Sequence, residues 1–337
     1  MNPRAESSRL SPDAKGILRP LMKEDNLGAS RFVRQMADVF CAYAEGWKGT
    51  SPTELISEIL AIGDFLVETR GANTPVIANA ARILLRELRD LPANTVGEVA
   101  ELMRSRRDEY MLLAESSRDR IATLGGRLLG ALDAVVAFDY SSTVMAILKR
   151  VADNGKSLKL VVPESRCLDG GRPIVNGATA MGHEAVFVVD FAIAAFLRRA
   201  DAVLFGAETI FANGDCWNTV GSYPIVSLAS QSAVPCYVAS ELLKMDHASF
   251  DGAPRAMRDH DFSKVLDYPN SFAHPDKVSV VGPDLDLVPA SMIRGYITEV
   301  GILPPTHLWR VGERYLKERG VVDERGQVLE RDSAEMQ

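Results

Sequence analysis

The feature that most constrains the fold is a change of hydrophobic period near Ala134. Before it, apolar residues recur at helical spacing and strand patterns are nearly absent. After it, short apolar runs alternate with helical stretches. The chain is therefore predicted to be an α/β protein in which a helical domain precedes a sheet domain. The predicted parts are a helical N-terminal domain over 1–132, a doubly wound sheet domain over 133–320, and a polar tail over 321–337.

The helical half contains clear start signals. Ser51 can cap a helix, Pro52 suits the first helical position, and Glu54 favours the positive end of the helix dipole. A helix from there should reach about Val67. A second helical segment is predicted after Pro75.

The apolar runs of the second half are continuous rather than alternating. Continuous apolarity is typical of parallel strands that are covered on both faces. It predicts a mostly parallel, doubly wound sheet with helices on either side. The runs are AVVAF (134–138), LKLVV (158–162), AVFVV (185–189), AVLFG (202–206), CYVAS (236–240) and a weaker KVSVV (277–281).

Charge and composition exclude several classes of protein. The net charge of −7 argues against a protein whose main partner is a nucleic-acid backbone. The 4 cysteines form no C-x-x-C pair and the 5 histidines have no ligand spacing, so no metal site is predicted. The chain lacks an apolar signal core and a run long enough to span a bilayer. We therefore expect a reduced, cytoplasmic protein without a membrane partner.

Polar residues follow almost every apolar run. Ligands of such sheets bind beyond the carboxyl ends of the strands, where these residues would gather. One such carboxylate is most simply a cap on the next helix. Several of them would repel one another unless they were paired, protonated or used, so as a set they predict a shared pocket. They are Asp139-Tyr140-Ser141-Ser142, Glu164-Ser165-Arg166, Asp190, Glu208, and Glu241 with Lys244 nearby.

These residues belong to an ordered series of motifs. The series is Glu164-Ser165-Arg166, Asp190, Gly206-Ala207-Glu208-Thr209-Ile210, Asn213-Gly214-Asp215, Asn218-x-x-Gly221-Ser222-Tyr223, Pro235-Cys236-Tyr237-Val238 and Ile297-Thr298-Glu299-x-Gly301-Ile302. In this order it resembles one superfamily, over roughly residues 50 to 317. That superfamily comprises the alpha, beta and delta subunits of eukaryotic initiation factor 2B, together with 5-methylthioribose-1-phosphate isomerase and ribose-1,5-bisphosphate isomerase.

The resemblance implies a helical domain on a Rossmann-like domain, a pocket between them for a sugar phosphate or nucleotide, and a homodimer formed through the C-terminal domain. The isomerases of this superfamily convert a C1-phosphorylated furanose into a ketose phosphate with a Cys and an Asp. Those two positions are Asp139 and Glu208 in this chain. The Lys of the family's Asn-Lys-Ile-Gly-Thr-Tyr motif is replaced by Thr219.

Two carboxylates that face one ligand can form an acid/base pair, because burial and repulsion raise one pKa and leave the other group ionised. With Asp139 as base and Glu208 as acid, the chain is predicted to be an aldose–ketose isomerase-like enzyme acting on a small phosphorylated sugar. Such proton transfer needs no metal or cofactor. The alternative is a non-catalytic sensor of sugar phosphates or nucleotides like the initiation-factor subunits, where Tyr and Ser also follow this strand, as Tyr140 and Ser141 do here.

Further residues are candidates for binding the substrate. Arg70 with Gly71 resembles a phosphate cradle, although an arginine there could equally cap a helix C-terminus. Arg166 could hold an anion or form a surface ion pair. A reaction at the thiol of Cys167 or Cys216 is a further alternative to an inert thiol. The predicted substrate-binding residues are Arg70, Gly71, Tyr140, Ser141, Glu164, Arg166, Asn218, Thr219 and Lys244.

Overall fold

The chain divides into two compact units. The computed structural model describes residues 10–23, 28–72, 74–251, 259–262 and 272–323. Unit 1 takes Met1–Glu115, Leu243–His247 and Gly312–Gln337, and unit 2 takes Ser116–Leu242 and Ala248–Val311. The division lies between Glu115 and Ser116, before the boundary at 132/133 that the sequence predicted. It falls inside one uninterrupted helix, α6 (Val96–Leu129).

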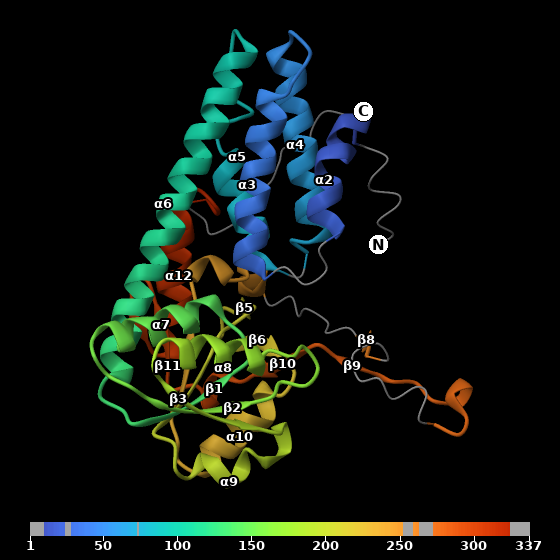
Figure 1. Cartoon of the computed structure of the whole chain (residues 1–337). Coiled ribbons are helices and arrows are strands. Elements are labelled where there is room, and N and C mark those ends of the chain that lie inside the picture. The colour runs from blue at the N-terminus through green and yellow to red at the C-terminus, as the bar shows by residue number, and fades with distance from the viewer. Residues whose placement is uncertain (1–9, 24–27, 73, 252–258, 263–271, 324–337) are drawn as a thin grey trace. The chain divides into compact units, whose positions relative to one another are not determined.

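Unit 1 is built from helices in its described part. Helix α3 packs against α2, α4 and α5, which run beside it in Figure 1. The predicted start of α4 is confirmed: Ser51 Oγ accepts a hydrogen bond from Glu54 N at 3.2 Å and Pro52 is the first helical residue. The helix continues two residues past the predicted end at Val67. The bounds are α2 Pro12–Lys23, α3 Ala29–Glu45, α4 Pro52–Thr69 and α5 Pro75–Leu85.

The predicted polar tail begins too early. Helix α12 (Leu308–Lys317) ends in a turn at Gly320, whose φ is 66°. That turn lets Val321 N donate to Leu316 O at 3.0 Å, as in a left-handed helix cap. Val321 and Val322 are consequently buried in unit 1. Residues 324–337 lie outside the described residues.

Unit 2 contains the predicted parallel sheet. Its strand order is β12-β11-β7-β4-β1-β2-β3, and all neighbours are parallel except β11 and β12. The fold class predicted from the sequence is confirmed. The bounds are β1 Ala134–Phe138, β2 Lys159–Pro163, β3 Glu184–Val188, β4 Ala202–Phe205, β7 Cys236–Ala239, β11 Gly295–Thr298 and β12 Gly301–Leu303.

Both faces of this sheet are covered. On one face Val135 and Ala137 of β1 pack with helices α7 and α8 in a single apolar cluster. The alternate residues Val136 and Phe138 point to the other face, where the ring of Phe138 lies against Gly221 before α10. Burial on both sides explains why the strands read as continuous apolar runs. The helices are α7 Ser142–Asp153, α8 Gly171–Ala180, α9 Ala194–Leu197 and α10 Ser222–Gln231.

The predicted strand at 277–281 is wrong. Residues Pro275–Lys277 form a short 3-10 turn, η6, and a strand begins only at Val281. That strand, β9 (Val281–Pro283), pairs with β8 (Asp259–Asp261) outside the large sheet. The place beside β7 belongs to β11, whose residues are all buried, whereas 277–279 are exposed. Alternation of polar and apolar residues in 277–281 does not suit a strand covered on both faces.

A second, antiparallel sheet lies in unit 2 and was not predicted. Its strand order is β10-β6-β5. The strands are β5 Thr209–Ile210, β6 Cys216–Thr219 and β10 Leu285–Val288. Across the described residues, the helices are all too short or too polar to cross a bilayer.

Candidate functional site

The sheet places its topological switch point between β1 and β4. From β1 the chain proceeds outward through β2 and β3, and then crosses to β4 on the other side of β1. Ligands of open α/β sheets bind at this point, beyond the carboxyl ends of the strands. Phe138 is in register with Phe205, so Asp139 and the 206–208 segment leave neighbouring strands at the same edge.

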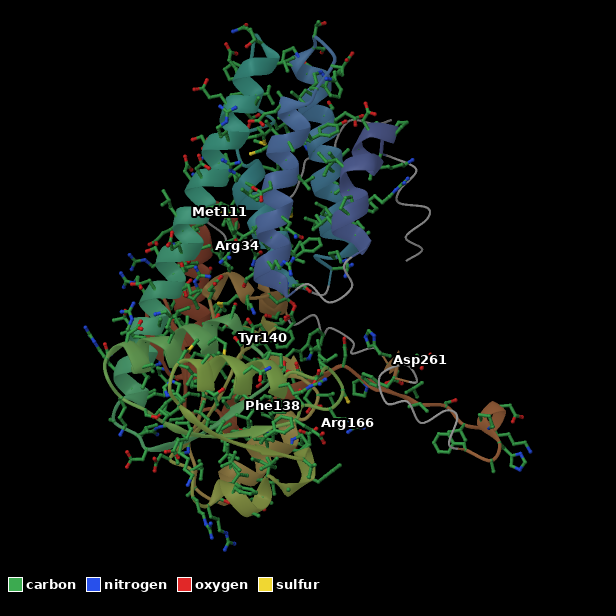
Figure 2. All side chains as sticks on the ribbon, in the orientation of Figure 1. Arg34, Met111, Phe138, Tyr140, Arg166 and Asp261 are labelled. Carbon is green, nitrogen blue, oxygen red and sulfur yellow. The ribbon has the colours of Figure 1, made fainter. Side chains whose placement is uncertain are left out.

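Asp139 is held in an unusual backbone conformation at the end of β1. Its φ is 57°, in the left-handed region that residues other than glycine rarely occupy. Ser165, at the end of the next strand, has a φ of 51°. Strained backbone of this kind gathers at functional sites, where the surrounding structure enforces it. Figure 2 labels Tyr140 and Arg166, which follow these two residues.

Two hydroxyl groups hold the carboxylate of Asp139. Ser165 Oγ donates to Oδ1 at 2.9 Å, and Thr219 Oγ1 donates to Oδ2 at 2.6 Å. Gly170 leaves the space that Oδ1 occupies, since a Cβ on Gly170 would lie 1.9 Å from that oxygen. The loop after β2, which contains Ser165 and Gly170, and strand β6 of the small sheet therefore define the position of this side chain.

The electrostatic surroundings of Asp139 favour its protonated form. Burial is the largest effect and raises the pKa of its carboxyl. Hydrogen bonds from Thr219, Ser165 and the Tyr140 N–H lower that pKa in part, whereas the Asp190 carboxylate raises it. A carboxyl group with a raised pKa is typical of a proton donor or acceptor near neutral pH.

Glu208 lies in the turn between β4 and β5. Its backbone N–H donates to Trp217 O at 2.8 Å, which fixes the turn. Its partly buried carboxylate has no hydrogen-bond or ion-pair partner among the described residues. Glu208 thus follows the strand next to that of Asp139, and its role as the partner of Asp139 stays a prediction.

Asn218 and Thr219 come from β6 and are both buried. Asn218 Nδ2 donates to Ser222 Oγ at 2.8 Å, and Ser222 Oγ donates to Thr219 O at 2.7 Å. These bonds tie the end of β6 to the start of α10. Thr219 therefore meets Asp139 directly at the position where a lysine is expected from the resemblance.

Asp190 and Asp286 stabilise the surrounding loops. Asp190 accepts hydrogen bonds from the backbone N–H groups of Ser165 at 2.8 Å and Arg166 at 2.9 Å. Asp286 Oδ2 accepts from Gly221 N at 2.8 Å and Tyr223 N at 3.0 Å, at the N-terminus of α10. The sequence predicted Asp190 as one of the strand-end residues of a shared pocket, whereas it gave no prediction for Asp286. Their signal is weak, because a carboxylate that caps a turn looks the same in the sequence as one that binds a ligand.

Glu164 and Arg166 line a cavity of about 350 Å³ with Asp169, Arg172 and Phe187. Arg166 Nη1 lies 3.5 Å from Glu164 Oε2, and the Arg172 guanidinium pairs with Asp169. Both arginines are largely exposed. The predicted surface ion pair is present, and binding of an anion by Arg166 stays a prediction.

The residues after Asp139 have different environments. Tyr140 is 52% exposed, whereas Ser141 Oγ accepts a hydrogen bond from Val144 N at 3.4 Å and caps α7. Gly206 lies directly against Ser141, since a Cβ there would come within 2.9 Å of its Oγ. The cap accounts for Ser141, and a role in ligand binding stays a prediction for both residues.

Arg70, Gly71 and Lys244 belong to unit 1. Arg70 is the C-cap residue of α4, its Nη2 donates to Met22 O at 3.4 Å, and its guanidinium lies 5.8 Å from the ring centre of Phe32. Gly71 is buried, and a Cβ there would meet Val67 O at 2.8 Å. Lys244 ends the 3-10 turn η3 (Leu242–Lys244). Substrate binding by these residues stays a prediction.

The cysteine thiols are unsuited to nucleophilic chemistry. Burial raises the pKa of Cys216 and of Cys236 to about 12. Burial also raises the pKa of Cys167, and the carboxylates of Asp190 and Asp286 raise it further. A thiol in these surroundings stays protonated and weakly reactive. Within the described residues there is no cluster of His, Cys, Asp and Glu that could hold a metal ion.

Comparisons with known proteins agree with this architecture. Residues 25–305 match the Initiation factor 2 subunit family. A ribose 1,5-bisphosphate isomerase of Methanocaldococcus jannaschii is 25% identical over 288 residues, which cover 86% of this chain and 90% of the relative.

Two solved structures from Pyrococcus horikoshii share the fold. The translation initiation factor eIF-2B has a TM-score of 0.70 and 23% identity, covering 88% of this chain and 98% of its own. The 5-methylthioribose 1-phosphate isomerase has a TM-score of 0.72 and 21% identity, covering 90% of this chain and 87% of its own.

Proposed function

Because the chain belongs to the Initiation factor 2 subunit family, we propose that it is a sugar-phosphate isomerase that converts a small C1-phosphorylated furanose into a ketose phosphate. The family contains both isomerases and initiation-factor subunits among the relatives of this chain. The observation that carries the proposal is the carboxyl group of Asp139, buried at the switch point and held by two hydroxyls. A buried carboxyl group with a raised pKa is typical of a group that exchanges protons near neutral pH, which supports catalysis.

The reaction needs one proton donor and one proton acceptor. An acid must protonate the ring oxygen as its bond to C1 breaks, and a base must accept the proton of the C2 hydroxyl. The hydrogen on C2 then moves to the electron-poor C1 together with the electron pair of the C2–H bond, and the electrons of the former O–H bond form the ketone at C2. Two positioned side chains supply this chemistry without a metal or a redox cofactor.

We assign the donor role to Asp139 and the acceptor role to Glu208. This exchanges the roles expected from the sequence, because Asp139 is the group whose pKa is raised. Glu208 follows the adjacent strand and has no partner among the described residues, so its carboxylate remains available to a ligand. Asn218 would orient the sugar hydroxyls, and Arg166 would bind its anionic group.

We also propose that two copies associate through the C-terminal domain. Strand β3 is an edge of the sheet, and the side chains around it are unusually apolar and exposed. Phe187 is 48% exposed, Val189 61% and Phe191 101%. Apolar groups exposed at the end of an edge strand and just after it favour a protein partner, and a second copy of the chain is the simplest one.

The test is an NMR time course in deuterated water with a panel of C1-phosphorylated furanoses and other pentose and tetrose phosphates. We expect ketose formation by the wild type and a loss of at least about 100-fold in D139N, the usual contribution of a general acid. The matched control is D90N, which removes one carboxylate from an exposed site. Ketose formation at an equal rate in D139N would refute the assigned role.

The second candidate is a non-catalytic sensor. Tyr140 and Ser141 favour it, since the resemblance places the same two residues in the initiation-factor subunits, and Ser141 is occupied as a helix cap. In the same experiment a sensor would broaden the lines of a bound sugar phosphate without turnover. That outcome across the whole panel would replace the isomerase proposal.

A further inference from the structure

Thr219 and Ser165 hold the two oxygens of Asp139 separately. Thr219 Oγ1 lies 2.6 Å from Oδ2 and Ser165 Oγ lies 2.9 Å from Oδ1, so each carboxyl oxygen has its own hydroxyl donor. Both donors are buried. Asp139 is 26 residues from Ser165 and 80 residues from Thr219 in the chain, so both bonds are tertiary contacts rather than parts of a local turn.

The two donors are themselves immobile. Thr219 pairs with Leu285 in the β6–β10 ladder, and its carbonyl accepts the Ser222 hydroxyl. Ser165 has a positive φ, and its N–H is bonded to Asp190. A carboxyl group held by rigid donors keeps one orientation, as acid/base chemistry on a small ligand requires.

The charges near Asp139 are negative. The Asp190 carboxylate acts on Asp139 and on Cys167, and the Asp286 carboxylate also acts on Cys167. Arg166 is largely exposed, and its guanidinium lies beside Glu164. Within these surroundings the hydroxyls of Thr219 and Ser165 and the Tyr140 N–H are the groups that favour the ionised form of Asp139.

We propose that Thr219 is the positioning residue of this site, and that its hydroxyl sets both the orientation and the protonation of Asp139. This inference rests on the proposed isomerase function for its kinetic consequence only. Thr219 keeps its own proton and contacts Asp139 rather than the reacting atoms. Ser165 holds the second oxygen in the same way, at a longer distance.

The first test is independent of catalysis. The carboxyl carbons of ¹³C-labelled aspartate are titrated by NMR in the full chain, and the Asp139 signal is identified by its absence in D139N. We expect T219V, which keeps the shape of the side chain, to raise the pKa of Asp139 by about one unit because a donor to the ionised form is lost. T219S should restore the wild-type value.

The matched control is T209V. Thr209 is fully buried in the neighbouring strand β5, and its Oγ1 has no hydrogen-bond partner among the described residues. Its replacement removes a buried hydroxyl of the same kind without touching Asp139. An Asp139 pKa that moves equally in T209V and T219V, or in neither, would overturn the inference.

The second test is the pH profile of isomerisation. A higher pKa keeps Asp139 protonated to higher pH, so the alkaline limb of the T219V profile should move upward. The turnover number should fall about tenfold while KM changes little, and T219S should recover both. If the carboxyl titration shifts but the wild type turns over no sugar phosphate, the positioning role stands and the proposed function fails. If the wild type is active and T219V has an unchanged profile and rate, the function stands and the positioning role fails.

Discussion

At the scale of single residues, Asp139 combines an unfavourable backbone conformation with a buried carboxyl group. Both features cost stability, and natural proteins keep such costs mainly where they serve a function. The hydroxyls of Ser165 and Thr219 offset only part of the cost of burial, because the pKa of Asp139 remains raised. The residue should therefore be dispensable for folding.

We predict that D139N is more stable than the wild type near neutral pH. A carboxyl group whose pKa is higher in the folded state stabilises the fold fully only below its unfolded pKa, and that contribution is lost as the pH rises through the folded pKa. D139N lacks this loss, so its free energy of unfolding at pH 7 should exceed that of the wild type by about 0.5–2 kcal/mol. The gain should disappear as the pH falls toward 4. Urea unfolding across this pH range measures it, with D90N as a control that should show no such trend.

At the scale of elements, the N-terminus of helix α10 is capped by a carboxylate from strand β10. Gly221, with a φ of 105°, precedes α10 and cannot cap it with a side chain. Asp286 of β10 supplies the missing acceptor by binding Gly221 N and Tyr223 N with one oxygen. The negative charge at this end also suits the helix dipole.

We predict that D286A destabilises unit 2 by about 1–2 kcal/mol, the usual cost of losing a helix cap. D286N keeps an oxygen acceptor and should retain part of that stability. Hydrogen exchange of the amides of Gly221 and Tyr223 locates the effect, since these two should lose protection first. Equal stability of D286A and the wild type would show that water replaces the cap without cost.

The strands show what sequence patterns can predict about such elements. The predicted bounds of β1 and β4 agree with the structure to within one residue, because burial on both faces of the sheet leaves an unbroken apolar run in the sequence. The short strands β5, β6 and β10 carry no such signal, as their residues are selected by contacts with loops distant in the chain. The family resemblance showed that Thr219 replaces a lysine. Its bond to Asp139 was not predicted, because that contact joins segments distant in the chain.

At the scale of the whole molecule, the chain passes between the units more than once. It leaves unit 2 for residues Leu243–His247, which belong to unit 1, and then returns. Within unit 1, Asn79 of α5 holds this segment: its Nδ2 donates to Leu243 O at 2.9 Å and to Met245 O at 3.0 Å. Gly312 makes room for Met245, since a Cβ there would lie 1.6 Å from its sulfur. A sequence pattern that treats domains as continuous ranges cannot show such an excursion.

We predict that N79A destabilises the protein by about 2–4 kcal/mol. Asn79 is fully buried, so its removal leaves two carbonyl groups without their donor in a place that water does not reach. N176A, on the exposed face of α8, is the matched control and should change the free energy of unfolding by less than about 0.5 kcal/mol. Because the segment joins the two units along the chain, its release in N79A should also lower the cooperativity of unfolding, seen as separate transitions for probes in each unit. A single transition with an unchanged midpoint would mean that other contacts hold the segment.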